Sequence, residues 1–145
     1  GAIYGIASIA ISQVINGQSA DDIDYTYASS IIKDLVNKVF EGIFPLNDRE
    51  FLNVNIPYKK NLDSKKYKIT YAGYRIYGSG ADMHKNPRGE EHYWLGLHPL
   101  RWKKREGINA MSDFDATKEG YVSLTPIKVD LSVYERLERL EKWIN

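Results

Sequence analysis

The first twelve residues constrain the fold most, because they form an apolar run without a charge, Gly-Ala-Ile-Tyr-Gly-Ile-Ala-Ser-Ile-Ala-Ile-Ser. A chain end frays into water unless it is tied down, and a run this rich in Ile and Ala belongs inside a protein. It is too short to span a membrane and lacks the basic residues that open a secretory signal. We therefore expect residues 6–12 to form a buried parallel strand, and Gly1 to follow a missing start of a larger α/β unit.

The composition excludes several classes of protein. Lys and Arg number 20 against 19 for Asp and Glu, and the net charge of +1 gives no overall attraction to nucleic acid or anionic membranes. The chain has no cysteine, which excludes disulfides, zinc–thiolate sites and thiol nucleophiles. The same lack of cysteine favours an intracellular, cytoplasmic location. With 43% hydrophobic and 27% charged residues, the sequence is typical of a soluble globular domain.

The first half of the chain has the pattern of a βαβ unit. Residues 27–40 carry apolar side chains at helical spacing, and Gly42 is expected to end this helix as a left-handed glycine. Residues 51–57 alternate instead, with Leu52, Val54 and Ile56 on one face and Asn53 and Asn55 on the other. Strand, helix and strand in this order predict a βαβ unit.

The second half is predicted to form a long hairpin and a bent strand. Residues 67–77 are strand-like, and their apolar phase slips at residues 72–73, which indicates a bulge. With residues 92–98 they predict a long β-hairpin that has a wide tip around residues 86–89. Residues 121–131 form another strand, whose apolar phase changes at Pro126. Because proline cannot donate to a ladder, we expect this strand to bend or change its pairing partner there.

The end of the chain is predicted to be an amphipathic helix that needs a docking surface. Ser132 and Glu135 have the spacing of a capping box at its start. Its apolar stripe consists of Val133, Leu137, Leu140 and Ile144. The docking surface must lie either in this chain or in a neighbouring one.

Two groups of residues suggest metal binding, and in both we favour a structural interpretation. The spacings of His84, His92 and His98 match no ligand motif, and we expect a hairpin to place them at different heights and on different faces. Asp21 and Asp22 follow a strand and a turn, where a divalent cation could bind. No neighbouring ligands support that interpretation, so we expect charges at the start of a helix, together with Asp24.

Two further segments leave alternatives open. Tyr, Lys and Arg alternate in residues 67–75, as in a stacking platform for single-stranded nucleic acid, although the neutral charge balance favours ordinary hairpin packing. Ser112 and Asp113 precede the bent strand without an apolar rhythm. Either one of them caps a short helical turn that Gly120 ends, or the pair lies near a substrate.

Several segments together resemble the survival protein SurE family, the 5′/3′-nucleotidases. Residues 1–12 resemble the family's G-A-L-x-G-I-P-A-I-A-V-S stretch, and residues 52–57 resemble its L-N-V-N-x-P strand. Residues 86–89 and 93–96 resemble its D-P-R-G and Y-W-I-G hairpin. Ser112-Asp113 with residues 119–131 resembles its T-D and G-Y-V-S-x-T-P-L tail. The matches follow the family's order along almost the whole chain, although Ser8, Asn86 and Ser112 replace the family's Pro, Asp and Thr.

The resemblance implies both a fold and an activity. The fold would be the C-terminal part of one Rossmann-type, three-layer α/β domain, with residues 1–60 ending the core and residues 61–145 forming the hairpin and tail. The activity would be metal-dependent hydrolysis of nucleoside 5′/3′-monophosphates. The family's ligands for Mg²⁺ or Mn²⁺ lie in an N-terminal part without a counterpart here. No catalytic residue or metal ligand is therefore expected in this chain, which would be inactive alone.

The resemblance also implies that copies of the chain assemble. The family exchanges its C-terminal strand and helix between subunits, so a homodimer or homotetramer is expected. The expected oligomer contacts are Arg88, Tyr93, Trp94, Pro126, Asp130, Leu137 and Leu140. Ser112 and Asp113 would lie near the substrate. The alternatives are a non-catalytic oligomerisation or binding module and, third, nucleic-acid binding by the Tyr-rich strand. We expect neither a membrane nor a nucleic-acid polymer as the partner.

Overall fold

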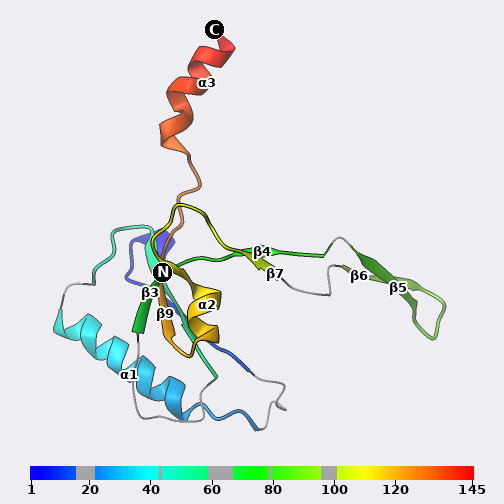
Figure 1. Cartoon of the computed structure of the whole chain (residues 1–145), viewed down its shortest axis with the longest axis horizontal. Coiled ribbons are helices and arrows are strands. Elements are labelled where there is room, and N and C mark those ends of the chain that lie inside the picture. The colour runs from blue at the N-terminus through cyan, green and yellow to red at the C-terminus, as the bar shows by residue number, and fades with distance from the viewer. Residues whose placement is uncertain (16–21, 43, 59–66, 79, 96–100) are drawn as a thin grey trace.

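The computed structural model describes residues 1–15, 22–42, 44–58, 67–78, 80–95 and 101–145. Figure 1 shows a body of sheet and helices, from which a hairpin arm and the C-terminal helix project in different directions. The helices are η1 (Ala2–Tyr4), α1 (Thr26–Glu41), α2 (Asp113–Lys118), η3 (Tyr134–Arg136) and α3 (Leu137–Ile144). The strands are β1 (Ile9–Gln13), β2 (Glu50–Ile56), β3 (Tyr67–Tyr71), β4 (Tyr74–Ile76), β5 (Ala81–Lys85), β6 (Glu91–Leu95), β7 (Arg101–Lys103), β8 (Met111–Ser112) and β9 (Val122–Lys128).

The body is built on a mixed sheet of five strands in the order β1-β2-β9-β3-β8. β1 and β2 pair in parallel, with Ile9 opposite Leu52, and α1 connects them. The βαβ prediction is therefore confirmed. β9 is antiparallel to β2 and parallel to β3, so strands from both halves of the chain share one sheet. The expected division near residue 60 falls outside the described residues.

One face of this sheet packs on α1 and forms the hydrophobic core. The alternation of β2 directs Val54 and Ile56 to this face, where they are fully buried against Ile31 of α1 and Val122 of β9. The predicted helix is thus confirmed within one residue at each end. The way it ends differs from expectation, since Gly42 is extended (φ −149°) and not left-handed.

The opposite face of the sheet is polar and carries α2. The residues of β2 and β9 that point away from α1 include Asn53, Asn55, Ser123 and Thr125. Ser123 and Thr125 are almost fully buried, and the Thr125 hydroxyl hydrogen-bonds that of Thr70 at 2.6 Å. With α1 on one face and α2 on the other, the body has three layers, and the α/β class is confirmed.

β1 is less buried than its apolar sequence predicts. Residues 10–12 are exposed, and the strand has β2 on one side and no described strand on the other. Helix α1 covers only the face that carries Ile9. The expectation of a strand buried on both faces is therefore wrong for this chain, because burial needs neighbours on the free edge and the second face.

Beyond Leu124, β9 pairs with β2 alone, and Pro126 lies in this part of the strand. β3 pairs only with Val122–Leu124, whereas β2 pairs along the strand and places Leu52 opposite Pro126. The Val129 amide donates to the Arg49 carbonyl at 2.9 Å, and the alternation of an antiparallel ladder then makes Leu52–Pro126 a non-hydrogen-bonded pair. The missing N–H of Pro126 thus costs the β2 ladder nothing. The predicted change of partner at Pro126 is therefore wrong, because β2 pairs with β9 on both sides of Pro126 and the pairing with β3 ends already at Leu124.

The arm consists of two antiparallel ladders, β4 with β7 and β5 with β6. A long hairpin is confirmed, but residues 67–71, expected in it, belong to the central sheet, and residues 91–95 pair with residues 81–85. Its tip is tight and not wide: the Gly89 amide donates to the Asn86 carbonyl at 2.9 Å, and Gly89 has φ +82°. The predicted bulge is in fact a break. At Ala72–Gly73 the chain leaves the five-stranded sheet for the arm, because the Gly73 amide donates to Asp113 instead of to a strand.

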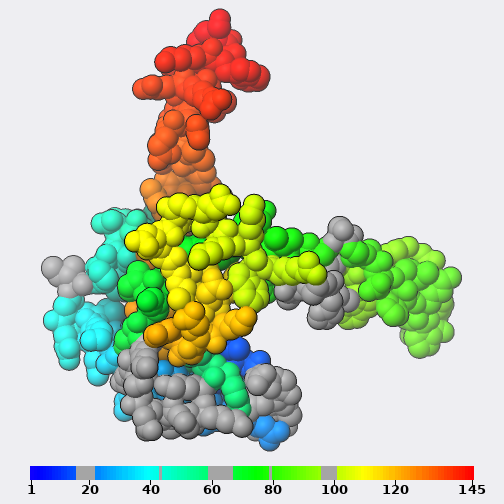
Figure 2. Space-filling view, in the orientation of Figure 1, coloured from blue at the N-terminus to red at the C-terminus, as the bar shows by residue number. Residues whose placement is uncertain are grey.

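The C-terminal helix begins later than its capping signal predicts. Ser132 does not cap it; its amide donates to a carboxylate oxygen of Asp130 at 3.0 Å. The turn η3 comes next, and α3 starts only at Leu137. The expected stripe is exposed, with Val133, Leu137, Leu140 and Ile144 between 54% and 71% accessible. Figure 2 shows this tail protruding well beyond the body.

Candidate functional site at the N-terminus of α2

Ser112 starts α2, as one of the two open interpretations predicts. Its hydroxyl accepts a hydrogen bond from the Asp115 amide at 3.1 Å and donates to the Asp115 carboxylate at 2.7 Å. It is 1% exposed, and Gly120, with φ +86°, follows the end of the helix. The N-cap interpretation is therefore confirmed for Ser112. A position near the substrate stays a prediction for both Ser112 and Asp113.

Asp113 is a buried carboxylate that holds three parts of the chain together. One oxygen accepts from the amides of Gly73 at 2.8 Å and Phe114 at 2.9 Å. The other accepts from the side-chain amide of Asn55 at 3.4 Å. A Cβ at Gly73 would lie 2.4 Å from the Phe114 ring, so only glycine lets the backbone approach this closely. Hydrogen bonds from backbone N–H groups thus stabilise the negative charge of the Asp113 carboxylate.

The hydrogen bonds continue from Asn55 to the edge strand β1. The Ser12 hydroxyl donates to the side-chain carbonyl of Asn55 at 2.5 Å, and these two residues are direct partners in the parallel register. Each is the last residue but one of its strand. Ligands of open α/β sheets bind beyond the carboxyl ends of parallel strands. We refer to Ser12, Asn55 and Asp113 as the polar line, which connects this edge to the buried carboxylate.

Asp115 links α2 to the root of the arm. Its carboxylate accepts from Ser112 and, at 3.0 Å, from the indole N–H of Trp102 on β7. These hydrogen bonds, Ser112 first, lower the pKa of Asp115 below its usual value. The Trp102 and Phe114 rings lie 5.7 Å apart, and the Arg75 guanidinium stacks 4.7 Å from the Phe114 ring centre. The arm is therefore anchored on α2 at its base.

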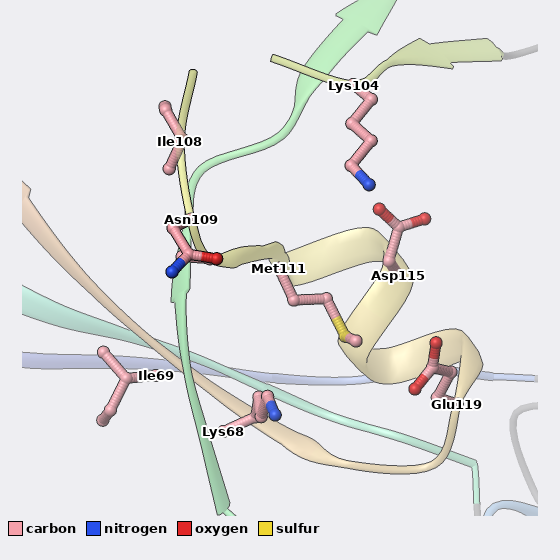
Figure 3. Close-up of a pocket in the computed structure, with 9 residues that line it drawn as sticks. Lys68, Ile69, Lys104, Ile108, Asn109, Met111, Asp115 and Glu119 are labelled. Carbon is pink, nitrogen blue, oxygen red and sulfur yellow. The ribbon is translucent and has the colours of Figure 1, made fainter. Parts of the chain in front are cut away.

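An open depression of about 790 Å³ lies beside α2 (Figure 3). Lys68, Lys104, Asp115 and Glu119 line it, so two cations and two carboxylates share one hollow. Figure 3 shows the Lys104 ammonium extending toward the Asp115 carboxylate. Charges of both signs neutralise one another here, and the hollow as a whole has no preference for a cation or an anion.

The polar line does not fit a divalent metal ion of the Mg²⁺ type. Such an ion prefers carboxylate oxygens, and Asp113 is the line's one carboxylate. Both of its oxygens already accept hydrogen bonds from N–H groups. Among the described residues, no group of three or more His, Asp or Glu side chains could hold a metal ion. We therefore derive no chemical step through a metal from these residues.

The histidine prediction is wrong in its geometry. His84 on β5 and His92 on β6 are direct cross-strand partners, at one height and on one face of the arm. The tight turn is the reason, since it fixes a register that brings residues eight apart opposite each other. His98 lies outside the described residues. Of the aspartates expected at the start of α1, Asp24 accepts from the Thr26 amide at 2.8 Å, which confirms its assignment; Asp22 is exposed and Asp21 is not described.

The expected oligomer contacts lie on three separate parts of the molecule. Arg88 is at the tip of the arm, and Tyr93 and Trp94, adjacent on β6, are 61% and 56% exposed. Pro126 is an exposed residue of β9, Leu137 and Leu140 belong to the stripe of α3, and Asp130 lies between these elements. The Ser132 amide and the Tyr134 hydroxyl lower the pKa of Asp130, in that order.

Sequence reasoning did not select two members of the polar line, nor the glycine that closes it. Asn55 had a signal, because its place in the alternation set it on the face opposite the core. Ser12 had none beyond its motif. Gly73 was recognised only as a break in strand phase, since its role depends on Asp113, forty residues away.

The sheet, its two helical layers and the polar line at the strand ends define a three-layer α/β protein. The crystal structure of the SurE protein from Aquifex aeolicus matches with a TM-score of 0.67 and 28% identity, over 99% of this chain and 54% of that chain. The family model described as "Survival protein SurE" matches residues 1–79. The chain belongs to the survival protein SurE family, as the sequence motifs predicted.

Two curated relatives are about half identical to this chain. The 5'-nucleotidase SurE of Wolinella succinogenes is 51% identical over 142 residues, which are 98% of this chain and 54% of the relative. The 5'-nucleotidase SurE of Sulfurimonas denitrificans is 49% identical over 149 aligned residues, covering 99% of this chain and 55% of the relative. The chain thus spans about half the length of the curated relatives it matches. None of the helices in the described part of the chain has the length and apolar character needed to cross a bilayer.

Proposed function

We propose that the chain is the C-terminal part of a metal-dependent phosphomonoesterase that hydrolyses nucleoside 5′/3′-monophosphates. The observation that carries this proposal is the 51% identity, over 98% of the chain, to a relative named 5'-nucleotidase SurE. Since the chain spans about half of that relative, the activity is proposed for the complete protein. The isolated chain is expected to be inactive.

In this proposal the two halves have different tasks. Residues outside this chain hold Mg²⁺ or Mn²⁺, which polarises the phosphoryl group when bound. The chain itself contributes the core and one wall of the site. Within that wall, Asp113 is fixed by the Gly73 and Phe114 amides and holds the Asn55 side chain, whose carbonyl in turn orients the exposed Ser12 hydroxyl. Ser112 stabilises this wall as the cap of α2.

We also propose that the arm and the tail make the oligomer contacts. An amphipathic helix whose apolar stripe is more than half exposed is unstable alone in water and gains by packing on another surface. When two copies exchange the segment after β9 together with α3, the apolar stripe of each copy packs on the other copy. Pro126 and Asp130 then lie where the two exchanged segments cross. Residues 1–60 then end the core and residues 61–145 supply the arm and the exchanged tail. The cytoplasmic location expected from the sequence stays a prediction.

A chimaera tests the proposed activity. In the Wolinella succinogenes relative, this chain replaces the half that it matches. Phosphate release from a nucleoside monophosphate is measured with Mg²⁺ or Mn²⁺, and with EDTA as the control. Metal-dependent release supports the proposal. A chimaera that folds, as judged by circular dichroism, but releases no more phosphate than the EDTA control contradicts it.

The second candidate is a non-catalytic oligomerisation or binding module. The observation that favours it is the exposure of the apolar residues of the arm and tail. Sedimentation velocity and mass spectrometry on the protein from its source separate the two. Self-association of an unextended 16.7 kDa chain supports the module, whereas a covalent chain about twice as long supports the enzyme.

A further inference from the structure

The arm carries two histidines in an arrangement that the proposed nucleotidase activity does not use. His84 and His92 are direct partners in the antiparallel register of β5 and β6. The Asn86 amide donates to the Glu90 carbonyl at 3.0 Å, which makes that pair hydrogen-bonded, and the alternation of the ladder makes His84–His92 hydrogen-bonded as well. The two Cα atoms of such a pair are about 5.5 Å apart, and both side chains leave the same face.

Two imidazoles at this separation can meet on one metal ion. Zinc–imidazole bonds are about 2.0–2.1 Å long, so the two ligand nitrogens at a metal are roughly 3 Å apart. Each histidine ring extends beyond its Cβ by enough to converge from a 5.5 Å base. Imidazole is a preferred ligand of Zn²⁺, Ni²⁺ and Cu²⁺, whereas Mg²⁺ prefers oxygen. The chemistry of the pair is thus distinct from that of a Mg²⁺-dependent phosphatase.

The hairpin holds the pair in place before any ion binds. At its tip the Asn86 side-chain oxygen accepts from the amides of Arg88 at 2.9 Å and Glu90 at 3.0 Å. The Asn86 side-chain amide donates to the Glu90 carboxylate at 2.7 Å. Together with the left-handed Gly89, these bonds fix the turn and hence the register of the strands above it. Ligands fixed in this way lose little conformational entropy on binding.

The charges around the pair also favour a cation. Strand alternation places Asp82 and Glu90 on the face of the histidines, next to them along each strand. It places Lys85 on the other face, where its ammonium lies 3.6 Å from the Glu91 carboxylate. The histidine face therefore has two acids and no lysine beside the pair. A divalent ion is attracted there and meets open solvent for its remaining ligands.

We propose that His84 and His92 form a two-imidazole site that binds one divalent transition-metal ion, with water completing the coordination. The bound ion connects β5 to β6 and so stabilises the arm in its hairpin form. The site is independent of the proposed nucleotidase function, because it needs only the arm.

Metal titration of the full chain tests this site, with Ni²⁺ and Zn²⁺ as probes and Mg²⁺ for comparison. By calorimetry we expect one Ni²⁺ per chain. His84→Asn or His92→Asn should each weaken binding at least about tenfold, and the double variant should bind no more tightly than a lone surface histidine does. His98→Asn, which removes the third histidine of the sequence, is the matched control and should leave binding unchanged.

Electron paramagnetic resonance distinguishes the loss of one metal ligand from a nonspecific loss of metal affinity. With Cu²⁺ bound, the electron paramagnetic resonance spectrum of the wild-type chain should show two imidazole nitrogens, and that of either single variant one. Circular dichroism shows whether the variants keep their fold, which is expected since both side chains are exposed. Equal Ni²⁺ affinity of the wild-type chain and the double variant overturns the proposal, as does a loss of binding on His98→Asn.

Discussion

Replacement of Gly73 by alanine should lower the free energy of unfolding by more than one added methyl group usually does. It brings the backbone against the Phe114 ring and the Asp113 carboxylate, and an added Cβ would lie 2.4 Å from the ring and 2.9 Å from a carboxylate oxygen. Gly73→Ala must therefore displace Phe114 or break the bonds to Asp113. We expect a loss of about 1–3 kcal/mol in the free energy of unfolding, measured by urea denaturation.

Gly80→Ala is the matched control for that change. A Cβ at Gly80 meets no atom within 4 Å, and its backbone does not adopt a positive φ. Its replacement should leave the free energy of unfolding within about 0.5 kcal/mol of the wild-type value, or slightly above it. Equal effects of the two substitutions would show that the close approach at Gly73 is not what fixes α2.

Asp115 gives the unfolding free energy a dependence on acid pH. Hydrogen bonds from Ser112 and Trp102 lower its pKa in the folded protein, so the ionised form is favoured by folding. Its contribution is complete above the unfolded pKa of about 3.9 and is lost as the pH falls through the lower folded value. Urea denaturation between pH 2 and 5 should therefore show a shallower loss of stability for Asp115→Asn than for the wild-type chain.

The control for this measurement is Asp82→Asn on the exposed arm. It makes the same change of functional group at an exposed residue of β5. An Asp115→Asn acid profile that coincides with that of Asp82→Asn would contradict the assignment of the effect to Asp115.

At the residue scale, the sequence predicted local contacts and missed distant ones. Ser112 was recognised as a possible cap because serine is a common N-cap residue, and the Asp115 amide that it accepts from lies only three residues away. The hydrogen bond between Asp113 and Asn55 joins residues 58 apart in the sequence, and no local sequence pattern indicates it. The same limit explains the histidines: their distance depends on the register, which the turn at Asn86–Glu90 determines.

At the scale of elements, α1 contributes most of the core, and two neighbouring isoleucines show how. Ile31 is fully buried against β2 and β9, whereas Ile32 is 37% exposed. Ile31→Ala should lower the free energy of unfolding by about 2–5 kcal/mol, because it leaves a cavity that the sheet cannot close. Thermal or urea unfolding followed at the far-ultraviolet helix signal measures the loss.

Ile32→Ala is the control on the same turn of the helix. It removes the same atoms where solvent already reaches them, and it gains helix propensity, so its cost should stay under about 1 kcal/mol. If Ile32→Ala cost as much as Ile31→Ala, the packed face of α1 would differ from the one described here.

Elements whose apolar face packs on the sheet were predicted well, whereas the exposed tail was shifted. The βαβ unit combined helical spacing with strand alternation, and each boundary moved by at most one residue for α1 and β2. The tail had a capping pattern at Ser132 and an apolar stripe, but the residues of the stripe stay more than half exposed. Without packing, the Asp130 carboxylate takes the Ser132 amide, and the regular helix begins five residues later, at Leu137.

At the scale of the whole molecule, two surfaces lack a neighbour among the described residues, the outer edge of β1 and the stripe of α3. Sequence reasoning expected both to be covered, since a parallel strand and an amphipathic helix each need a partner. Sequence reasoning did not predict the layer of buried hydroxyls on the sheet face that carries α2. Its hydroxyls are satisfied by one another and by Asn55, as in the Thr70–Thr125 pair, and composition alone does not indicate such a layer.

The exposed stripe leads to a prediction about assembly, which rests on the proposed exchange of the tail. Burial of a leucine side chain contributes about 1.5–3 kcal/mol, and each copy loses two such contacts when Leu137 and Leu140 are replaced. The double variant Leu137→Ser/Leu140→Ser should therefore associate at least tenfold more weakly, by about 1.4 kcal/mol or more. Sedimentation velocity over a range of protein concentrations measures the shift toward monomer.

The matched control makes the same number of serine substitutions on the same helix. Arg139→Ser/Lys142→Ser lies outside the stripe, so it imposes a similar loss of helix propensity without removing apolar contact area. It should assemble like the wild-type chain, whereas a wild-type chain that is monomeric at 100 µM, about the upper range for a specific weak complex, would refute the exchange. Because the stripe residues are more than half exposed, neither double variant should change the unfolding free energy of the monomeric body by more than about 0.5 kcal/mol. A stripe variant that unfolds the body would instead place α3 in the core of its own chain.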